Sequence, residues 1–183
     1  MLDAGVNLGI GTDGANCSDN QNMYEAMRLA SFVSKVQGPD WRRWMTTREV
    51  ALAATQGSAR ALGFGDRIGR IARGYQADLV LLDLDHPNWL PFNDPVNQLV
   101  HAEDGNAVHS VMIAGRMVVE NRRVLTVDMG RLRTRVAAAR DRLAIANADN
   151  RRLYEALEPV VGSYCPGLAR TPYHVHRYGA RPE

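Results

Sequence analysis

Residues 5–14 of this 183-residue chain read Gly5-Val6-Asn7-Leu8-Gly9-Ile10-Gly11-Thr12-Asp13-Gly14. The apolar side chains alternate with small or polar ones, which predicts a short buried strand over residues 5–12. The glycines that follow predict a sharp turn, so Asp13 is left at the carboxyl end of the strand. In a barrel of parallel strands that end carries the active site, and a carboxylate there can bind a metal ion and accept a proton.

A small polar loop leads from this turn into a helix predicted over residues 22–37. Asn22 and Glu25 have the spacing of a helix start, and Gly38-Pro39 is expected to end the helix. One face of the helix is apolar and consists of Met23, Met27, Ala30 and Val33.

A second helix is predicted over residues 47–56, because Thr46 and Glu49 have the spacing of a capping box. Gly57-Ser58 is expected to interrupt this helix before a short continuation to Leu62. From Arg67 onward the hydrophobic period becomes strand-like.

The strand-like region begins with residues 79–84, which are nearly all apolar and predict a strand covered on both faces. A tight hairpin and a further turn are predicted later: residues 108–113, Ala114-Gly115, residues 116–119 and residues 120–123. The loop over residues 85–95 is rich in Pro and Asn. Its Trp89 and Phe92 are predicted to pack in the interior, and lining a substrate mouth is the alternative.

Three blocks of sequence, in this order, resemble the amidohydrolase superfamily, in particular its deaminase and chlorohydrolase branch. They are Gly11-Thr12-Asp13-Gly14; residues 54–63, which read Ala-Thr-Gln-Gly-Ser-Ala-Arg-Ala-Leu-Gly; and residues 68–83, which read Ile-Gly-Arg-Ile-Ala-Arg-Gly-Tyr-Gln-Ala-Asp-Leu-Val-Leu-Leu-Asp. In that family they are similar to the turn after the eighth strand of a (β/α)8 barrel, a linking helix, and a strand pair of a β-sandwich.

The resemblance implies an α/β fold in three parts. Residues 1–63 are expected to form the last strand and helices of a (β/α)8 TIM-type barrel, residues 64–127 the C-terminal part of a composite β-sandwich, and residues 128–183 a long helix and a tail. A whole barrel takes about 250 residues, so we expect the chain to be the C-terminal part of a longer enzyme.

Asp13 is implied by the resemblance to be both a metal ligand and a catalytic proton acceptor. The implied cofactor is one divalent metal, Zn²⁺ before Fe²⁺, which activates water for attack on a ring carbon that bears an amino or chloro leaving group. The implied reaction is hydrolysis of a non-peptide C–N bond, by deamination of a purine, pyrimidine or triazine-like ring. The alternative for Asp13 alone is a turn residue that caps its own loop.

The remaining ligands implied by the family are histidines that precede this turn, and none lies ahead of Asp13 here. His86, His101 and His109 follow it, and His174-Val175-His176 imitates a ligand pair in a Pro- and Arg-rich tail. A catalytic zinc site takes about three protein ligands. The chain alone is therefore expected to be inactive.

Asn16 and Ser18 follow the metal-ligand position closely. We expect them to contact substrate or to support the metal ligand, and helix entry is the alternative. Cys17 has no basic neighbour in sequence that favours a thiolate, so core packing or loop filling is expected for it.

The last predicted element is a helix over residues 129–157 with a heptad-like apolar pattern. We expect this helix to pack on the outer wall of the barrel, and a dimer contact is the alternative. Residues 163–183 are expected to form a surface tail.

Composition narrows the class of protein. The net charge is +2, and the 22 basic residues are scattered along the chain with no aromatic-interleaved basic stripe, which argues against nucleic-acid binding. No apolar run approaches the roughly 20 residues of a membrane span, and two cysteines favour a reducing cytoplasm. The expected partner is a small heterocyclic substrate, with a homo-oligomer as a further expectation. The rival prediction is a non-catalytic fragment or interaction module.

Overall fold

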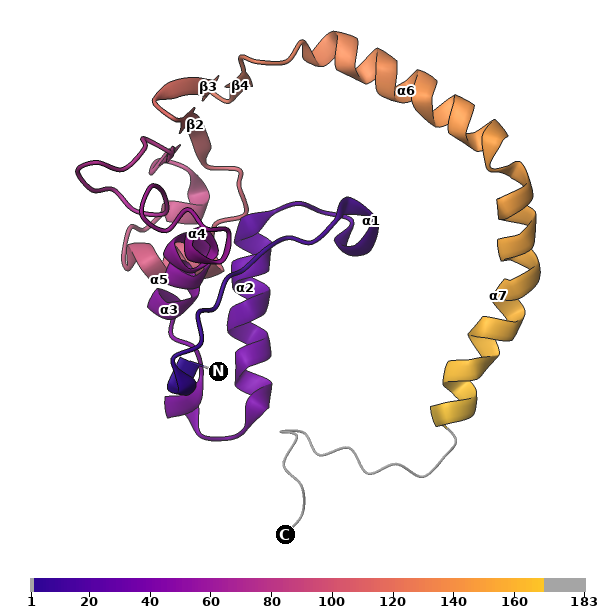
Figure 1. Ribbon diagram of the computed structural model, residues 1–183, viewed down its shortest axis with the longest axis horizontal. Helices are drawn as coiled ribbons and strands as arrows, with labels where there is room; N and C mark the ends of the chain where they lie inside the picture. Colours follow the sequence, from indigo (N-terminus) through magenta and orange to yellow (C-terminus); the bar gives the residue numbers. More distant parts are fainter. Residues whose placement is uncertain (1, 170–183) are drawn as a thin grey trace. The chain divides into compact units, whose positions relative to one another are not determined.

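The computed structural model describes residues 2–169, which divide into two compact units, residues 2–126 and 127–169 (Figure 1). The first unit contains helices packed around a small core and one antiparallel sheet. The second contains two consecutive helices. None of the described helices is both long enough and apolar enough to cross a membrane.

The core of the first unit lies between three helices: α2 (Met23–Ser34), α3 (Thr47–Leu52) and α5 (Pro95–His101). Met27, Val50 and Val100, one from each helix, are buried together. The predicted face of α2 is therefore only partly right, because Met27 is buried whereas Val33 is half exposed.

The predicted helix starts are confirmed. The side chain of Asn22 accepts hydrogen bonds from the backbone N–H groups of Tyr24 and Glu25 at the start of α2. Thr46 and Glu49 form a complete capping box at the start of α3. Short 3-10 turns, η2 (Lys35–Gln37) and η3 (Trp41–Arg43), connect the two helices.

The helix after Thr46 is not interrupted at Gly57-Ser58, contrary to the prediction. It widens into a π-helical turn, η4 (Ala53–Gly57), and continues as α4 (Ser58–Ala61). π-turns of this kind occur frequently at functional sites. Here the turn presents Gly57 and Ser58 to residues 7–10.

Residues 5–12 are not assigned to a strand, which corrects the first prediction. A parallel strand needs a neighbour to satisfy its backbone groups, and no described strand lies beside this segment. The Ser58 hydroxyl satisfies the backbone groups of Ile10 instead. The N–H of Ile10 donates to Ser58 Oγ (3.0 Å), and Ser58 Oγ donates to the carbonyl of Ile10 (2.8 Å). The segment therefore lies against the π-turn.

Two glycines allow that close approach. A Cβ on Gly57 would lie 2.0 Å from the carbonyl oxygen of Leu8, and one on Gly9 would lie 3.2 Å from the Cα of Ser58. The side chain of Asn7 adds two hydrogen bonds. Its Nδ2 donates to the carbonyl of Gly57 (3.0 Å), and its Oδ1 accepts from Arg60 Nε (2.8 Å). These contacts fix the chain just before Asp13.

The sheet contains four antiparallel strands in the order β1 (Leu79–Leu82), β2 (Val108–Ile113), β3 (Arg116–Glu120) and β4 (Arg123–Val124). The predicted hairpin at Ala114-Gly115 is confirmed, and both residues have positive φ. The second turn is confirmed at Asn121-Arg122, again with positive φ.

Two expectations about this region are wrong. The strand pair expected within residues 68–83 is a single strand, because residues 68–78 form turns. Val80 and Leu81 are 54% and 47% exposed, so β1 is not covered on both faces. Within the described residues there is one sheet, and the expected two-layer sandwich is not seen there.

The Pro- and Asn-rich loop is more regular than expected, since it contains η5 (Pro87–Trp89) and leads into α5, which was not predicted. Asp94 caps α5, and Pro95 occupies its first turn. Trp89 is buried, so interior packing is confirmed for it. Phe92 stacks on Trp89 with ring centroids 6.4 Å apart but stays half exposed.

The second unit consists of two largely exposed helices, α6 (Met129–Ala146) and α7 (Ala148–Ala169). The single helix predicted over residues 129–157 is thus two helices, separated at Asn147, where φ is −100°. The helix also runs beyond the predicted end and into the expected tail. Residues 170–183 lie outside the described residues.

Candidate metal centre

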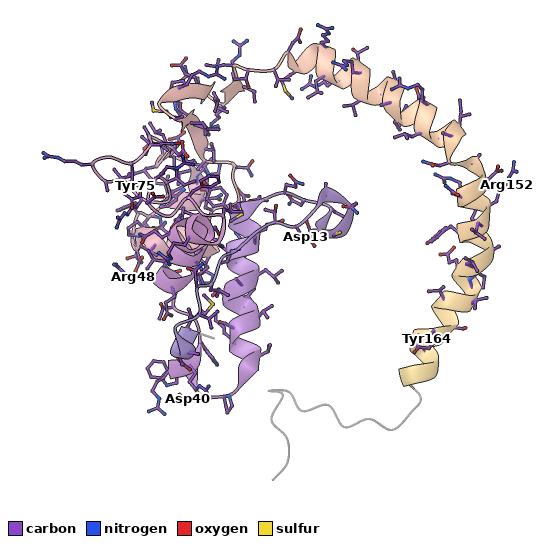
Figure 2. The ribbon with its side chains drawn as sticks, viewed as in Figure 1. Asp13, Asp40, Arg48, Tyr75, Arg152 and Tyr164 are labelled. Atoms are coloured by element: carbon purple, nitrogen blue, oxygen red, sulfur yellow. The ribbon has the colours of Figure 1, made fainter. Side chains whose placement is uncertain are left out.

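Asp13 lies in a tight turn on the surface of the first unit, ahead of the short helix α1 (Ala15–Ser18) (Figure 2). Its φ of 61° is in the left-handed region, which Asp tolerates better than most residues. One carboxylate oxygen, Oδ1, accepts a hydrogen bond from the backbone N–H of Gly14 at 2.7 Å. The side chain is thus held by its own turn and remains exposed.

Ser18 supports this turn from the far end of α1. Its hydroxyl donates to the carbonyl of Thr12 at 2.7 Å, and it lies 2.8 Å from the carbonyl of Asn20. Asn16 is exposed beside the turn and makes no side-chain hydrogen bond within the described residues. Cys17 is a free, exposed cysteine, so core packing is wrong for it and loop filling stays a prediction.

The loop then returns to α2 at a fixed point. Asn20 Nδ2 donates to Glu25 Oε2 at 2.5 Å. Asn22, the N-cap of α2, donates from its Nδ2 to the carbonyl of Asp104 at 2.6 Å. The Asp13 loop is therefore anchored at both ends, by Ser58 before it and by Asp104 after it.

Sequence reasoning missed a buried carboxylate next to this second anchor. Glu103 is fully buried. Its Oε2 accepts from Trp89 Nε1 (2.6 Å), and its Oε1 accepts from the backbone N–H groups of Gly105 (2.7 Å) and Ala107 (3.1 Å). Its carbonyl accepts from Arg28 Nη2 (2.8 Å) on α2. The available signal was a Glu-Asp-Gly-Asn run after an apolar stretch, which is typical of an exposed turn and does not reveal partners distant in sequence.

The charges around Glu103 change the acidity of its neighbours. Burial, and then the negative charge of Glu103, raise the pKa of Tyr24 to about 12. Hydrogen bonds from Asn106, first from its backbone and then from its side chain, lower the pKa of Asp104 against the opposing effect of desolvation. The carboxylate of Glu103 is fully paired within this cluster, whereas Arg28 Nε is buried there without a hydrogen-bond partner among the described residues.

The three histidines of the described region do not converge on Asp13. His101 stacks on Phe32 with ring centroids 5.7 Å apart, and burial lowers its pKa, as do the charges of Lys35 and Arg28. The other two make short-range contacts: the N–H of Asn88 donates to His86 Nδ1, and His109 lies beside Ser110.

Across residues 2–169, no three His, Cys, Asp or Glu side chains are grouped so as to hold a metal ion. His174 and His176 lie outside the described residues. Asp13 itself fits the part of one ligand. Its Oδ1 is oriented by Gly14, and its Oδ2 accepts no hydrogen bond within the described residues, so that oxygen is open to a cation.

A family model described as the amidohydrolase family matches residues 1–118. Among curated relatives, a 5-methylthioadenosine/S-adenosylhomocysteine deaminase of Acetivibrio thermocellus is 42% identical over 129 residues, which is 70% of this chain and 30% of that protein. The enzyme of the same name from Natronomonas pharaonis is 39% identical over 130 residues, 71% of this chain and 30% of that protein. The chain thus spans about a third of the length of these relatives.

Solved structures agree with the sequence matches. An adenosine deaminase from Xanthomonas campestris with bound zinc is 37% identical, with a TM-score of 0.75 over 79% of this chain and 33% of that one. An atrazine chlorohydrolase from Arthrobacter aurescens TC1 complexed with zinc is 31% identical, with a TM-score of 0.69 over 75% of this chain and 30% of that one. Since the family model covers well over half of the sequence, the chain belongs to the amidohydrolase family.

Proposed function

We propose that this chain forms the C-terminal part of a metal-dependent amidohydrolase that hydrolyses a non-peptide C–N bond. The observation that carries the proposal is the match of residues 1–118 to the family together with the oriented, exposed carboxylate of Asp13. The matched structures with bound zinc support a divalent metal, with Zn²⁺ preferred and Fe²⁺ as the alternative.

The substrate class that we propose is a purine nucleoside derivative with an exocyclic amino group. The support is the identity of 42% to a 5-methylthioadenosine/S-adenosylhomocysteine deaminase and of 37% to an adenosine deaminase. In such a deamination, the oxygen of water bonds to the ring carbon and the amino group leaves as ammonia. A pyrimidine or triazine-like ring is the second candidate, supported by the similarity to a chlorohydrolase.

Asp13 is assigned two roles in this reaction, as metal ligand and as proton acceptor. A bound metal would supply a water of lowered pKa. The Asp13 carboxylate would take the proton of that water and pass it toward the leaving group, because one of its oxygens is free while the other is fixed by Gly14.

Ser18 and Asn16 are assigned different supporting roles. Ser18 holds the turn through the carbonyl of Thr12, so it fixes the direction of the Asp13 side chain. Asn16 is exposed beside the same turn, and we assign it to substrate contact.

The domain assignment that goes with this function keeps three parts. In this proposal, residues 1–63 supply the last strand position and helices of the barrel, residues 64–127 the C-terminal part of the β-sandwich, and residues 128–183 the C-terminal helix and tail. Support comes from the structural likeness to amidohydrolases over 79% of the chain. In a complete barrel, residues 5–12 would gain the neighbouring strand that they lack here.

The second candidate function is that of a non-catalytic fragment or interaction module. It is favoured by one observation, which is that the described residues gather no ligand set around Asp13. The two candidates differ in whether a reading frame with the missing His ligands is joined to this sequence. A barrel of ordinary size predicts an in-frame extension of about 250 to 300 residues.

The test uses the chain and, if the extension exists, the longer protein. For the chain alone, elemental analysis after dialysis against zinc should give negligible metal. For the longer protein, we expect near-stoichiometric metal and release of ammonia from adenosine derivatives, both lost in Asp13→Asn. Asp19→Asn is the matched control, because Asp19 is exposed in the same loop with a φ of 57°. An active Asp13→Asn variant contradicts the proposal.

A further inference from the structure

The helices of the second unit carry an apolar stripe that continues through both of them. Residues three and four apart alternate without a break, and we call this set the seam: Met129, Leu132, Val136, Ala139, Leu143, Ala146, Asn150, Leu153, Leu157, Val160 and Tyr164. In heptad letters, the seam occupies positions a and d throughout. It lies wholly beyond residue 118, where the family match ends.

The change of helix at Asn147 does not shift the seam. The N–H of Asn147 donates to the carbonyl of Leu143, and the N–H of Arg151 donates to the carbonyl of Asn147, both at 2.9 Å. Both bonds have i to i−4 spacing, so α7 follows α6 directly after Asn147 with no longer loop between them. At 1.5 Å per residue, the seam runs about 27 Å along α6 and about 22 Å along α7, where Pro159 lies between Leu157 and Val160.

Neither α6 nor α7 covers this face of the second unit. Every seam side chain is exposed except Ala139, which is half buried, and Leu143 is 58% exposed. The surface is hollowed along α6 into a groove of about 450 Å³, lined by Val136, Ala139, Arg140, Leu143, Ala144, Asn147 and Arg151. Contiguous exposed apolar surface of this kind marks an interaction site.

The charges beside the seam differ between the two helices. α6 carries five arginines against one aspartate, whereas α7 has two arginines against three acidic residues. Positions e and g flank the seam, and on α6 they are all arginine: Arg133, Arg135, Arg140 and Arg142. A partner that lies along α6 must therefore bring neutral or acidic flanks.

A second copy of this chain meets that requirement in only one direction. In a parallel pair, Arg135 would face Arg140 of the second copy, which is repulsive. In an antiparallel pair, α6 lies along α7 of the second copy. The nearest flanking contacts are then Arg142 with Asp149 and Arg133 with Tyr154, an ion pair and a cation–π contact.

The register of the antiparallel pair is also determined. When Leu143 faces Ala146 of the second copy, every seam residue from 129 to 160 has a seam partner. Sliding by one heptad in one direction brings Arg142 against Arg142, and sliding in the other brings Asp149 against Asp149. The favoured register places polar Asn150 opposite Ala139, whose small side chain leaves room for a hydrated amide.

We propose that α6 and α7 are a self-association surface, and that its occupant is a second copy of this chain in antiparallel orientation. The proposal does not depend on the deaminase activity, since no residue of the first unit takes part in it. It predicts a symmetric contact, in which each pair of residues occurs twice.

The first test measures the mass of the full chain by light scattering over a dilution series. We expect a dimer, weakened about tenfold by Arg142→Asp because two ion pairs become two repulsive pairs. The double variant Arg142→Asp with Asp149→Arg restores the pairing and should return the affinity to within about threefold. Circular dichroism shows that each variant keeps its helices. A monomeric chain, or a double variant no better than the single one, overturns the proposal.

The second test measures orientation by disulfide cross-linking, with Cys17 and Cys165 replaced by Ser. A chain with Ala139→Cys and Asn150→Cys should form a covalent dimer, because the two positions face each other in the antiparallel pair. Ala139→Cys alone is the matched control and should remain uncross-linked. Cross-linking of the single variant means a parallel pair and overturns the proposed orientation. Association only with anionic lipid vesicles overturns the proposed occupant.

Discussion

Two carboxylates of the first unit, Asp13 and Glu103, show opposite ways of holding a charged group. Asp13 is exposed, and among the described residues its carboxylate accepts one hydrogen bond, from the next residue in the chain. Glu103 is fully buried, and its carboxylate accepts three hydrogen bonds, one of them from Trp89, 14 residues away. One carboxylate oxygen of Asp13 accepts no hydrogen bond from the described residues, whereas both carboxylate oxygens of Glu103 accept hydrogen bonds within the fold.

The difference teaches that Asp13, the proposed metal ligand, is held indirectly. Little touches the Asp13 side chain, yet the chain on both sides of it is fixed, by Ser58 before the loop and by Asp104 after it. Disturbing the supports should therefore cost folding free energy, while changing Asp13 itself should cost little. The four predictions below test this contrast, beginning with the support of the Asp13 segment.

The largest effect is expected for Gly57→Ala. The new Cβ would lie 2.0 Å from the carbonyl oxygen of Leu8, so residues 5–14 must move away from the π-turn. Overpacking against backbone costs about 3 kcal/mol of unfolding free energy. Urea unfolding measures that loss, and hydrogen exchange should show faster exchange of the Ile10 amide.

Gly11→Ala is the control for that experiment. Gly11 lies in the same segment, but nothing lies within 4 Å of the position of its Cβ. Its effect should stay near the few tenths of a kcal/mol typical of surface sites, about 0.5 at most. Equal losses for both variants contradict the close contact between Gly57 and Leu8.

The second prediction concerns the buried carboxylate. Glutamine at position 103 keeps one acceptor oxygen, so its amide N–H₂ must face either the Trp89 indole or the N–H groups of Gly105 and Ala107. An unsatisfied buried donor makes Glu103→Gln cost about 2 kcal/mol in urea unfolding.

The same substitution in a Trp89→Phe background isolates the cause. The indole donor is then absent, and the glutamine oxygen can stay with the two backbone donors. The cost of Glu103→Gln should fall to about 0.5 kcal/mol, as a double-mutant cycle measures. An unchanged cost in that background means that Glu103 acts through something other than its donors.

The features that could be predicted from the sequence are those that depend on residues close together in the chain. The caps at Asn22 and Thr46 and the hairpin at Ala114-Gly115 were predicted, because each depends on residues within a few positions. The family was predicted from three short blocks of contiguous residues taken in order, and the family match confirms it. The role of Asp13 stays a prediction.

The errors arise where distant residues decide. A strand was predicted over residues 5–12, but strand formation depends on a neighbour, and Ser58 supplied the hydrogen bonds instead. The buried hydrogen-bond cluster around Glu103 depends on Trp89 and Arg28, which are 14 and 75 residues away in sequence. No local sequence pattern encodes such pairs. The π-turn was mistaken for an interruption, since glycine usually ends a helix.

The third prediction concerns how the unfolding free energy depends on pH through Tyr24, which lies beside Glu103. The folded pKa of Tyr24 is raised from 10.0 to about 12, so the folded state keeps a proton that the unfolded state loses. Its contribution is complete below pH 10 and is lost as the pH rises through 12. Because the phenol is partly exposed, screening reduces the change to about 1 kcal/mol.

Tyr24→Phe is the variant that checks this assignment. Its unfolding free energy should fall less steeply between pH 10 and 12 than that of the unmodified chain, because the shifted phenol is gone. Glu103→Gln should reduce the shift only in part, since burial is its larger cause and the charge of Glu103 the smaller. If the unfolding free energies of the Tyr24→Phe chain and the unmodified chain fall in parallel between pH 10 and 12, a group other than Tyr24 causes the pH dependence.

The fourth prediction expects the smallest effect on folding at Asp13, the proposed metal ligand. Asparagine at position 13 retains an oxygen for the N–H of Gly14 and tolerates a φ of 61°. Asp13→Asn should therefore change the unfolding free energy by less than about 0.5 kcal/mol, as should Asp19→Asn. A loss above about 1 kcal/mol at Asp13 alone would favour the turn-capping interpretation. A negligible loss, combined with lost activity in the longer protein, means that this carboxylate is retained for chemistry, because folding does not require it.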